Sequence, residues 1–182
     1  MSLDTSSRTT RFLLADILTS GYRVVGKIMT ASNGAMGMLN DPNHSSIDIN
    51  DARMARLHMP TKLIDHFEQV RMMKKNVHAV CLARREDLGP QAIVRGGFTN
   101  IVEYPVRIST TMFEVEGTME LPGRFDFPTL MTDGSRNFLP VFNATLTAIL
   151  IPSLRVESAG ILVNRNLVDL MALLNQRVKL EN

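Results

Sequence analysis

The sequence has no tryptophan, only two tyrosines and a single cysteine among its 182 residues. The lone thiol, Cys81, cannot form a disulfide within the chain, which fits a reducing compartment. Because 45% of the residues are hydrophobic, a core can still form, and twelve methionines with many aliphatic residues must fill it. Methionine adapts to irregular gaps. We therefore expect a folded chain rather than a disordered one.

A strong charge of one sign and long apolar runs are also missing. The net charge of +2 is too small to indicate a nucleic-acid partner by itself. No apolar run approaches the length that crosses a bilayer, and residues 1–10 are polar, unlike a secretory signal. These features predict a soluble, cytoplasmic protein that does not contact a membrane.

Motifs for catalysis and metal binding are absent from the sequence. It contains no nucleophile elbow, phosphate loop or dinucleotide fingerprint. His44 lies near Asp41 and Asp48 in a polar loop, but no HxxxH, HxH or CxxC spacing supports a metal site. His78 and Cys81 are three residues apart, so on a strand they would face opposite sides and could not act as base and nucleophile. We predict a non-enzymatic protein with no catalytic residue, metal site or cofactor.

The clearest feature that is present is an internal repeat. At a shift of 91 residues the matched pairs include Ile17 with Ile108, Thr19 with Thr110, Tyr22 with Phe113, Val24 with Val115 and Gly26 with Gly117. At a shift of 92 they include Asp41 with Asp133, Ala52 with Ala144 and Pro60 with Pro152. Later, the shift falls to 81, which aligns 80–82 with 161–163. Because the shift falls, the first copy is predicted to carry an insertion within residues 61–75. Chance similarity between β-rich segments is the alternative.

The repeated regions have the alternation of strands. Predicted strands cover 12–19, 22–30, 47–59 and 77–83 in the first copy, and 106–111, 113–121, 138–151 and 160–164 in the second. Another is predicted within 91–103, around Gly96–Gly97. Gly26 and Gly117 fall in mid-strand, where glycine marks the bends that a small barrel needs to close.

Two segments instead have apolar residues at helical spacing. The predicted insertion, 61–75, fits a helix, with a long hairpin as the alternative, and 166–179 fits a C-terminal helix. The predicted fold is therefore mainly β, with two repeated small antiparallel β-barrel units of SH3-like type and these two helices. The predicted units are 12–102 and 103–182.

Within this class the first copy resembles an Sm-like unit. The stretch Gly21–Ile28 followed by Met38–Asp41 is similar to the family's first motif, which has a turn glycine, a mid-strand glycine and an Asn–Asp pair. Ile93–Gly96 followed by Ile101–Val102 resembles its second motif, Arg-Gly before a terminal strand. The chain departs from the family in two ways, because the loop before Met38 lacks the usual acidic residue and the Arg-Gly segment has two residues too many. The resemblance implies a small-barrel fold and, less directly, RNA binding.

Basic residues are concentrated in the first copy. If a hairpin folds back there, they would form one positive face that contacts phosphate groups without reading sequence. An ordinary solvated face is the alternative. The candidate residues for binding a nucleic acid or another partner are Arg53, Arg56, Arg71, Lys74, Lys75, Arg84, Arg85 and Arg95.

Two functions remain open from the sequence. The first is a non-enzymatic binding or assembly module of unknown ligand, which forms a homo-oligomer or associates with a protein partner, because edge strands of repeated β units can pair. The second is an RNA-binding protein that uses the basic face of the first copy. The copies agree in their strands and differ in their polar loops, so a localised function is expected in what is unique to one copy, chiefly residues 61–75.

Overall fold

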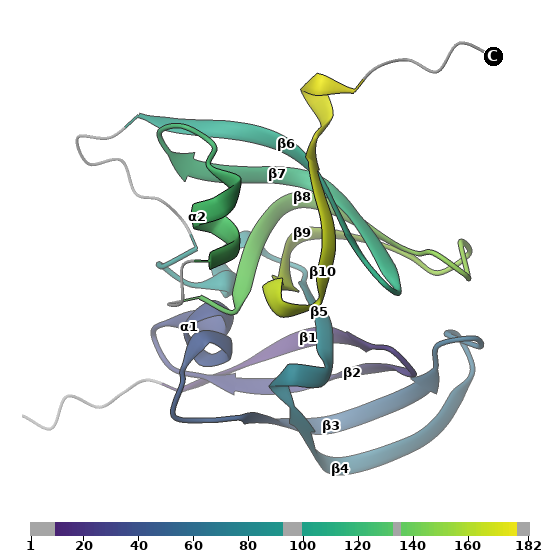
Figure 1. Cartoon of the computed structure of the whole chain (residues 1–182). Helices are drawn as coiled ribbons and strands as arrows, with labels where there is room; N and C mark the ends of the chain where they lie inside the picture. The colour runs from purple at the N-terminus through teal and green to yellow at the C-terminus, as the bar shows by residue number, and fades with distance from the viewer. Residues whose placement is uncertain (1–9, 93–99, 133–135, 178–182) are drawn as a thin grey trace, which may run out of the picture.

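The structure is a computed structural model that describes residues 10–92, 100–132 and 136–177. Ten antiparallel strands form one sheet with the order β10-β6-β7-β8-β9-β5-β1-β2-β3-β4. In Figure 1, β1–β4 occupy the lower part of the molecule and β6–β8 the upper part. The mainly β prediction is confirmed. The sheet is open, with β4 and β10 at its two edges, so the two predicted units share one sheet.

The first half of the chain contains five strands and one short helix. Its elements are β1 (Arg11–Thr19), β2 (Tyr22–Thr30), α1 (Gly34–Asn40), β3 (Ser46–Arg56), β4 (Leu63–Met73), η1 (Lys74–Asn76), β5 (Val77–Leu82) and η2 (Arg85–Leu88).

The second half begins at β6 and follows the same order of strands and helix. Its elements are β6 (Ile101–Thr110), β7 (Phe113–Pro122), α2 (Phe127–Thr132), β8 (Phe138–Ala148), β9 (Arg155–Asn164), η3 (Arg165–Leu167), β10 (Val168–Leu173) and η4 (Leu174–Gln176). Within the sheet, β10-β6-β7-β8-β9 therefore has the arrangement of β5-β1-β2-β3-β4.

Both predicted helices are wrong. Residues 61–75 contain strand β4, which pairs with β3 over its whole length, as the alternative of a long hairpin expected. Residues 166–177 contain β10 between two short 3-10 turns. Both strands lie at an edge of the sheet with exposed residues on both faces, so the strict alternation that identifies a half-buried strand is lost.

The alignment at a shift of 81 is also wrong, and with it the insertion. It matched 80–82 with 161–163, but these segments belong to β5 and β9, which are paired neighbours: Val80 lies opposite Leu162. The fifth strand of the second half is β10, and β4 corresponds to β9 in the order of elements. The strand predicted within 91–103 lies mostly outside the described residues, as do Ile93–Gly96 of the second motif, and β6 begins at Ile101.

The two mid-strand glycines lie at equivalent irregularities of the sheet. The pairing of β2 with β3 shifts next to Gly26, and that of β7 with β8 shifts next to Gly117. Across from them, Asp51 and Asn143 have positive φ angles of 51° and 46°. A Cβ atom on Gly26 would lie 2.5 Å from Ile49 Cγ2. Glycine therefore permits the close approach that the bulge requires.

Two apolar cores fill the molecule, and each draws on both halves. The first consists mainly of residues from β1–β5 and α1, with Phe138, Phe142 and Leu162 from the second half. The second consists mainly of residues from β6–β9, with Leu18, Leu57, Ala79 and Cys81 from the first half. The strand pair β5–β9 runs between them, so the halves are joined by packing as well as by backbone hydrogen bonds.

Candidate interaction surface

The structure gives several of the predicted basic residues acidic partners. Arg71, on β4, donates to Asp48 on β3 with a nitrogen–oxygen distance of 2.7 Å. This hydrogen bond lowers the pKa of Asp48 below its ordinary value. Arg85 forms an ion pair with Glu120 and places its guanidinium 4.1 Å from the centroid of the Phe142 ring. Arg85 is therefore half-buried in a contact between the two halves, whereas Arg71 stays exposed beside its acidic partner.

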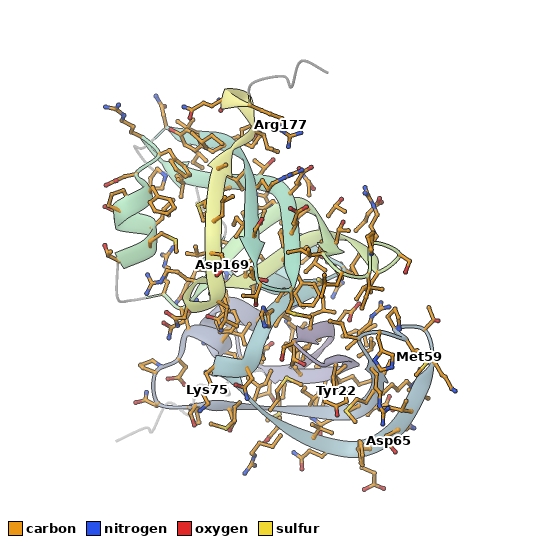
Figure 2. All side chains as sticks on the ribbon, turned by 45° about the vertical axis from the view of Figure 1, so that its right-hand side comes forward. Tyr22, Met59, Asp65, Lys75, Asp169 and Arg177 are labelled. Carbon is orange, nitrogen blue, oxygen red and sulfur yellow. The ribbon has the colours of Figure 1, made fainter. Side chains whose placement is uncertain are left out.

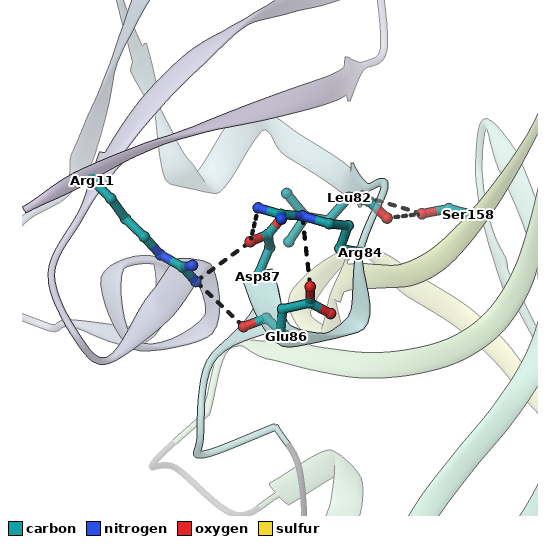
Figure 3. Close-up of polar contacts among 6 residues, drawn as sticks. All are labelled: Arg11, Leu82, Arg84, Glu86, Asp87 and Ser158. Carbon is teal, nitrogen blue, oxygen red and sulfur yellow. Dashed lines mark hydrogen bonds and ion pairs between the residues drawn. The ribbon is translucent and has the colours of Figure 1, made fainter.

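Arg84 belongs to a small network of charges after β5. Figure 3 shows its guanidinium between Glu86 and Asp87, with Arg11 approaching Asp87 from β1. The Arg84–Asp87 distance is 3.2 Å, and this hydrogen bond raises the pKa of Arg84. The same figure shows Ser158 of β9, whose hydroxyl accepts from the Leu82 amide and donates to the Leu82 carbonyl.

Lys74 is buried rather than presented to a partner. Its Nζ donates to the carbonyl oxygens of Met38 and Asp41, at 2.7 and 3.0 Å, where helix α1 ends. Desolvation lowers the pKa of this ammonium group. A cation is favoured at the C-terminal end of a helix, where unpaired carbonyl groups point outward.

Five of the predicted basic residues are exposed, and Arg71 and Arg84 are the two that have acidic partners. The other three are Arg53, Arg56 and Lys75. In the part of the chain that the structure describes, none of them forms an ion pair within 4.0 Å. Arg95 lies outside the described residues. The nucleic-acid alternative thus depends on fewer available cations than the sequence indicated, and it stays a prediction.

The cysteine and histidine side chains that the sequence offered for catalysis or metal binding lie in contacts of the folded structure. Cys81 is a buried free thiol, and burial raises its pKa. His78 is buried too, with Nδ1 3.2 Å from the hydroxyl of Thr110, and desolvation lowers its pKa. His44 is exposed and contacts Asp41. Among the residues that the structure describes, no three His, Cys, Asp or Glu side chains converge as a metal site.

The first notable surface is the outer edge of β4. Within the described ranges this eleven-residue strand pairs with β3 alone. Leu63, Phe67 and Met73 are exposed along it, and Val70 and Met72 are half-buried. Next to them lies an open hollow of about 670 Å³ whose lining includes Tyr22 and Met54. Figure 2 shows Asp65 on this outermost strand and Tyr22 on β2 nearby.

The second surface is the outer edge of β10, at the opposite end of the sheet. This strand pairs with β6 and, among the described strands, with no other. Leu170 and Ala172 are exposed, and Met171 and Leu173 are half-buried. Figure 2 shows Asp169 on this strand. An unpaired strand with apolar side chains is a template for pairing with another chain.

Sequence reasoning missed both edges because it interpreted 61–75 and 166–179 as helices. The signal that could have found them was the continuation of the shift of 91 to the end of the chain, which aligns η1 with η3 and β5 with β10.

Comparisons with known proteins find no match to a family model, a curated protein or a solved structure. In the described part of the chain, no helix has the length and apolar character needed to span a membrane.

Proposed function

We propose that this protein is a non-enzymatic binding or assembly module that associates through β4 and β10, the two edge strands of the sheet that the described residues form. One observation carries the proposal: β4 and β10 each expose apolar side chains along an open row of backbone donors and acceptors. Natural proteins commonly protect such edges with short strands, charges or covering loops. Strand β4 is eleven residues long and exposes Leu63, Phe67 and Met73. Its length and its exposed apolar side chains favour a role in binding a partner.

We also propose that the chain arose by duplication of a small β unit. The common order of elements supports this, as do two equivalent details. Thr19 Oγ1 accepts from the amides of Gly21 and Tyr22 at the first hairpin, and Thr110 Oγ1 accepts from those of Met112 and Phe113 at the corresponding one. A second equivalent pair of contacts joins the 3-10 turns to the start of the third strand, Lys74 N to Ser45 O and Arg165 N to Asn137 O.

The assembly function is tested by measuring mass and backbone protection together. We expect the mass in solution to rise with protein concentration, and the amides of β4 and β10 to exchange more slowly with deuterium in the associated form. A chain that stays monomeric up to high micromolar concentration, with both edges exchanging freely, would argue against self-assembly as the function. Loss of association at high salt but not at low salt would identify charges, not strand edges, as its source.

A further inference from the structure

Among the described strands, one pair joins the two halves of the chain, and its register is defined. Strand β9 of the second half pairs antiparallel with β5 of the first half. The opposed residues are Ala79 with Val163, Val80 with Leu162, Cys81 with Ile161, and Leu82 with Gly160. All eight are buried: the seven side chains have exposures of 4% or less, and Gly160 lies against the side chain of Leu88.

The pairing inside each half assigns an equivalent to every residue of this junction. Ser46 lies opposite Met73, and Phe138 lies opposite Asn164. Continuing along both hairpins, Val70 corresponds to Ile161 and Met72 to Val163. In the same way β10 corresponds to β5, because both follow a three-residue 3-10 turn directly. The free edges β4 and β10 are therefore the equivalents of the two strands that pair inside the chain.

We propose that β4 of one chain pairs antiparallel with β10 of a second copy, head to tail, in the register of the internal junction. This pairing places Met72 opposite Leu170, Arg71 opposite Met171, Val70 opposite Ala172, and Gln69 opposite Leu173. The inference rests on the proposed assembly function and specifies its partner as a second copy of this chain.

Burial in the two halves supports this assignment. Leu170 is 50% exposed, whereas its equivalent in the internal junction, Ala79, is 1% exposed. Ile149 is 42% exposed, whereas Leu57 at the equivalent position is 3% exposed and packs in the second core.

The same contrast holds on the other side of the proposed contact. Tyr22 beside β4 is 44% exposed, whereas Phe113 is 1% exposed. Val70 and Met72 are half-buried, but Ile161 and Val163 have no exposed surface. The equivalents of Tyr22, Val70, Met72, Ile149 and Leu170 are thus all buried at or beside the internal junction. Burying these five residues would remove apolar surface from water, which favours association.

The opposite face of the edge differs from the internal junction. There Leu162 and Phe142 pack into the first core, but their equivalents on β4 and β3 are Arg71 and Asn50. Arg71 is already held by Asp48. The proposed interface therefore has one apolar face, formed by Val70, Met72, Leu170 and Ala172. Its other face is mixed, because Arg71 and Gln69 of β4 lie opposite Met171 and Leu173 of β10.

Pairing of two different edges is heterologous, so each chain binds one neighbour through β4 and another through β10. Repetition of such a contact gives a closed ring if the rotation between neighbours closes, and a filament if it does not. A two-fold dimer made by two copies of the same edge is the competing arrangement.

Mixing two edge variants of the full-length chain separates these arrangements. Met72→Asp and Leu170→Asp each bury a charge in the apolar face and should weaken self-association about tenfold or more. Mixed together, the two variants should form a heterodimer and nothing larger, since one intact β4 and one intact β10 remain. Asp65→Asn, on β4 outside the register, is the control and should associate as the wild type does.

The mixing experiment also has clear contrary outcomes. If Leu170→Asp associates normally while Met72→Asp does not, β4 pairs with itself, and the head-to-tail inference is wrong although assembly through an edge stands. If the wild type itself stays monomeric, the inference and self-assembly fail together.

Cysteine cross-linking tests the register without depending on destabilising charges. In a Cys81→Ala background, Val70→Cys combined with Ala172→Cys should form disulfides between chains on oxidation, giving a ladder of multimers, because opposed residues are about 5 Å apart. The matched control, Val70→Cys with Val168→Cys, is displaced by four residues, or about 13 Å, and should not cross-link. Equal cross-linking of both pairs, or a product with the mass of one chain, would overturn the proposed register.

Discussion

In each half, one basic side chain connects a 3-10 turn to the short α-helix. Lys74 reaches the carbonyl oxygens of Met38 and Asp41, and Arg165, at the same place in the second half, donates to the carbonyl oxygen of Leu130 at 3.4 Å. Both are almost fully buried. Each side chain connects a helix to the turn that precedes the last strand of its half. The number of basic residues in a sequence does not distinguish this structural role from partner binding.

Replacing Lys74 by methionine should therefore destabilise the fold. The stem is retained, but two carbonyl groups lose their donor in a partly buried site, so the free energy of unfolding should fall by about 1–3 kcal/mol. Urea unfolding measures this. Lys75→Met changes the neighbouring exposed lysine and should stay within about 0.5 kcal/mol of the wild type. Equal effects of the two substitutions would show that the Lys74 contacts contribute nothing.

Burial of His78 makes stability depend on pH. Desolvation lowers its pKa in the folded state from 6.5, while the charge of Asp169 has a smaller effect in the opposite direction. Below pH 6.5 the unfolded chain binds a proton that the folded chain resists, so this contribution to stability is present above that pH and is lost as the pH falls through the folded pKa. Thermal melts of the wild type should therefore show falling stability on mild acidification. His78→Gln should flatten that dependence, and an unchanged slope would contradict the assignment.

The bulge opposite Gly26 is the element on which the bend of the β2–β3 pair depends. A Cβ atom at this position would lie 2.9 Å from the carbonyl oxygen of Asn50, a backbone atom that no rotamer change can move. Gly26→Ala should cost about 1–3 kcal/mol of unfolding free energy. Gly21→Ala is the matched control, because its Cβ would meet nothing within 4 Å, and it should be neutral. Chemical denaturation of both variants tests this, and an equally tolerated Gly26→Ala would exclude a close-packed bulge.

Most strands could be predicted from the sequence because one of their faces is buried. The predicted 12–19, 22–30 and 138–151 match β1, β2 and β8 to within a few residues. The edge strands could not be predicted in the same way. Most residues of β4 are exposed, on both faces of the strand. Its sequence therefore lacks the alternation that indicates a strand, and its apolar positions also fit a helical spacing. Tertiary pairing with β3 decided the outcome.

The candidate surface was harder to predict than the strands, for a related reason. Basic residues can be counted in a sequence, but their ion pairs, such as Arg71 with Asp48 and Arg85 with Glu120, depend on register and on contacts between the halves. An unpaired edge is a property of the whole sheet. It becomes visible only when the order of all ten strands is known.

At the scale of the whole molecule, the two halves should unfold together. Leu162 has no exposed surface and packs in the first core although it belongs to the second half. Leu162→Ala should lower the free energy of unfolding by about 2–5 kcal/mol. The loss should appear equally in hydrogen-exchange probes on β2 and on β7, since the shared cores and the β5–β9 pairing couple both halves.

The matched control for this prediction is Leu150→Ala, which removes the same atoms from a side chain that is 79% exposed. It should change stability by no more than about 0.5 kcal/mol. Two separate transitions, with the Leu162→Ala effect confined to β7, would mean that each half folds independently. A single transition would instead mean that the β5–β9 junction is strong enough to bind two halves into one cooperative unit. The β5–β9 pairing would then show that a contact of this kind is stable, which supports the equivalent pairing of β4 with β10 between two chains.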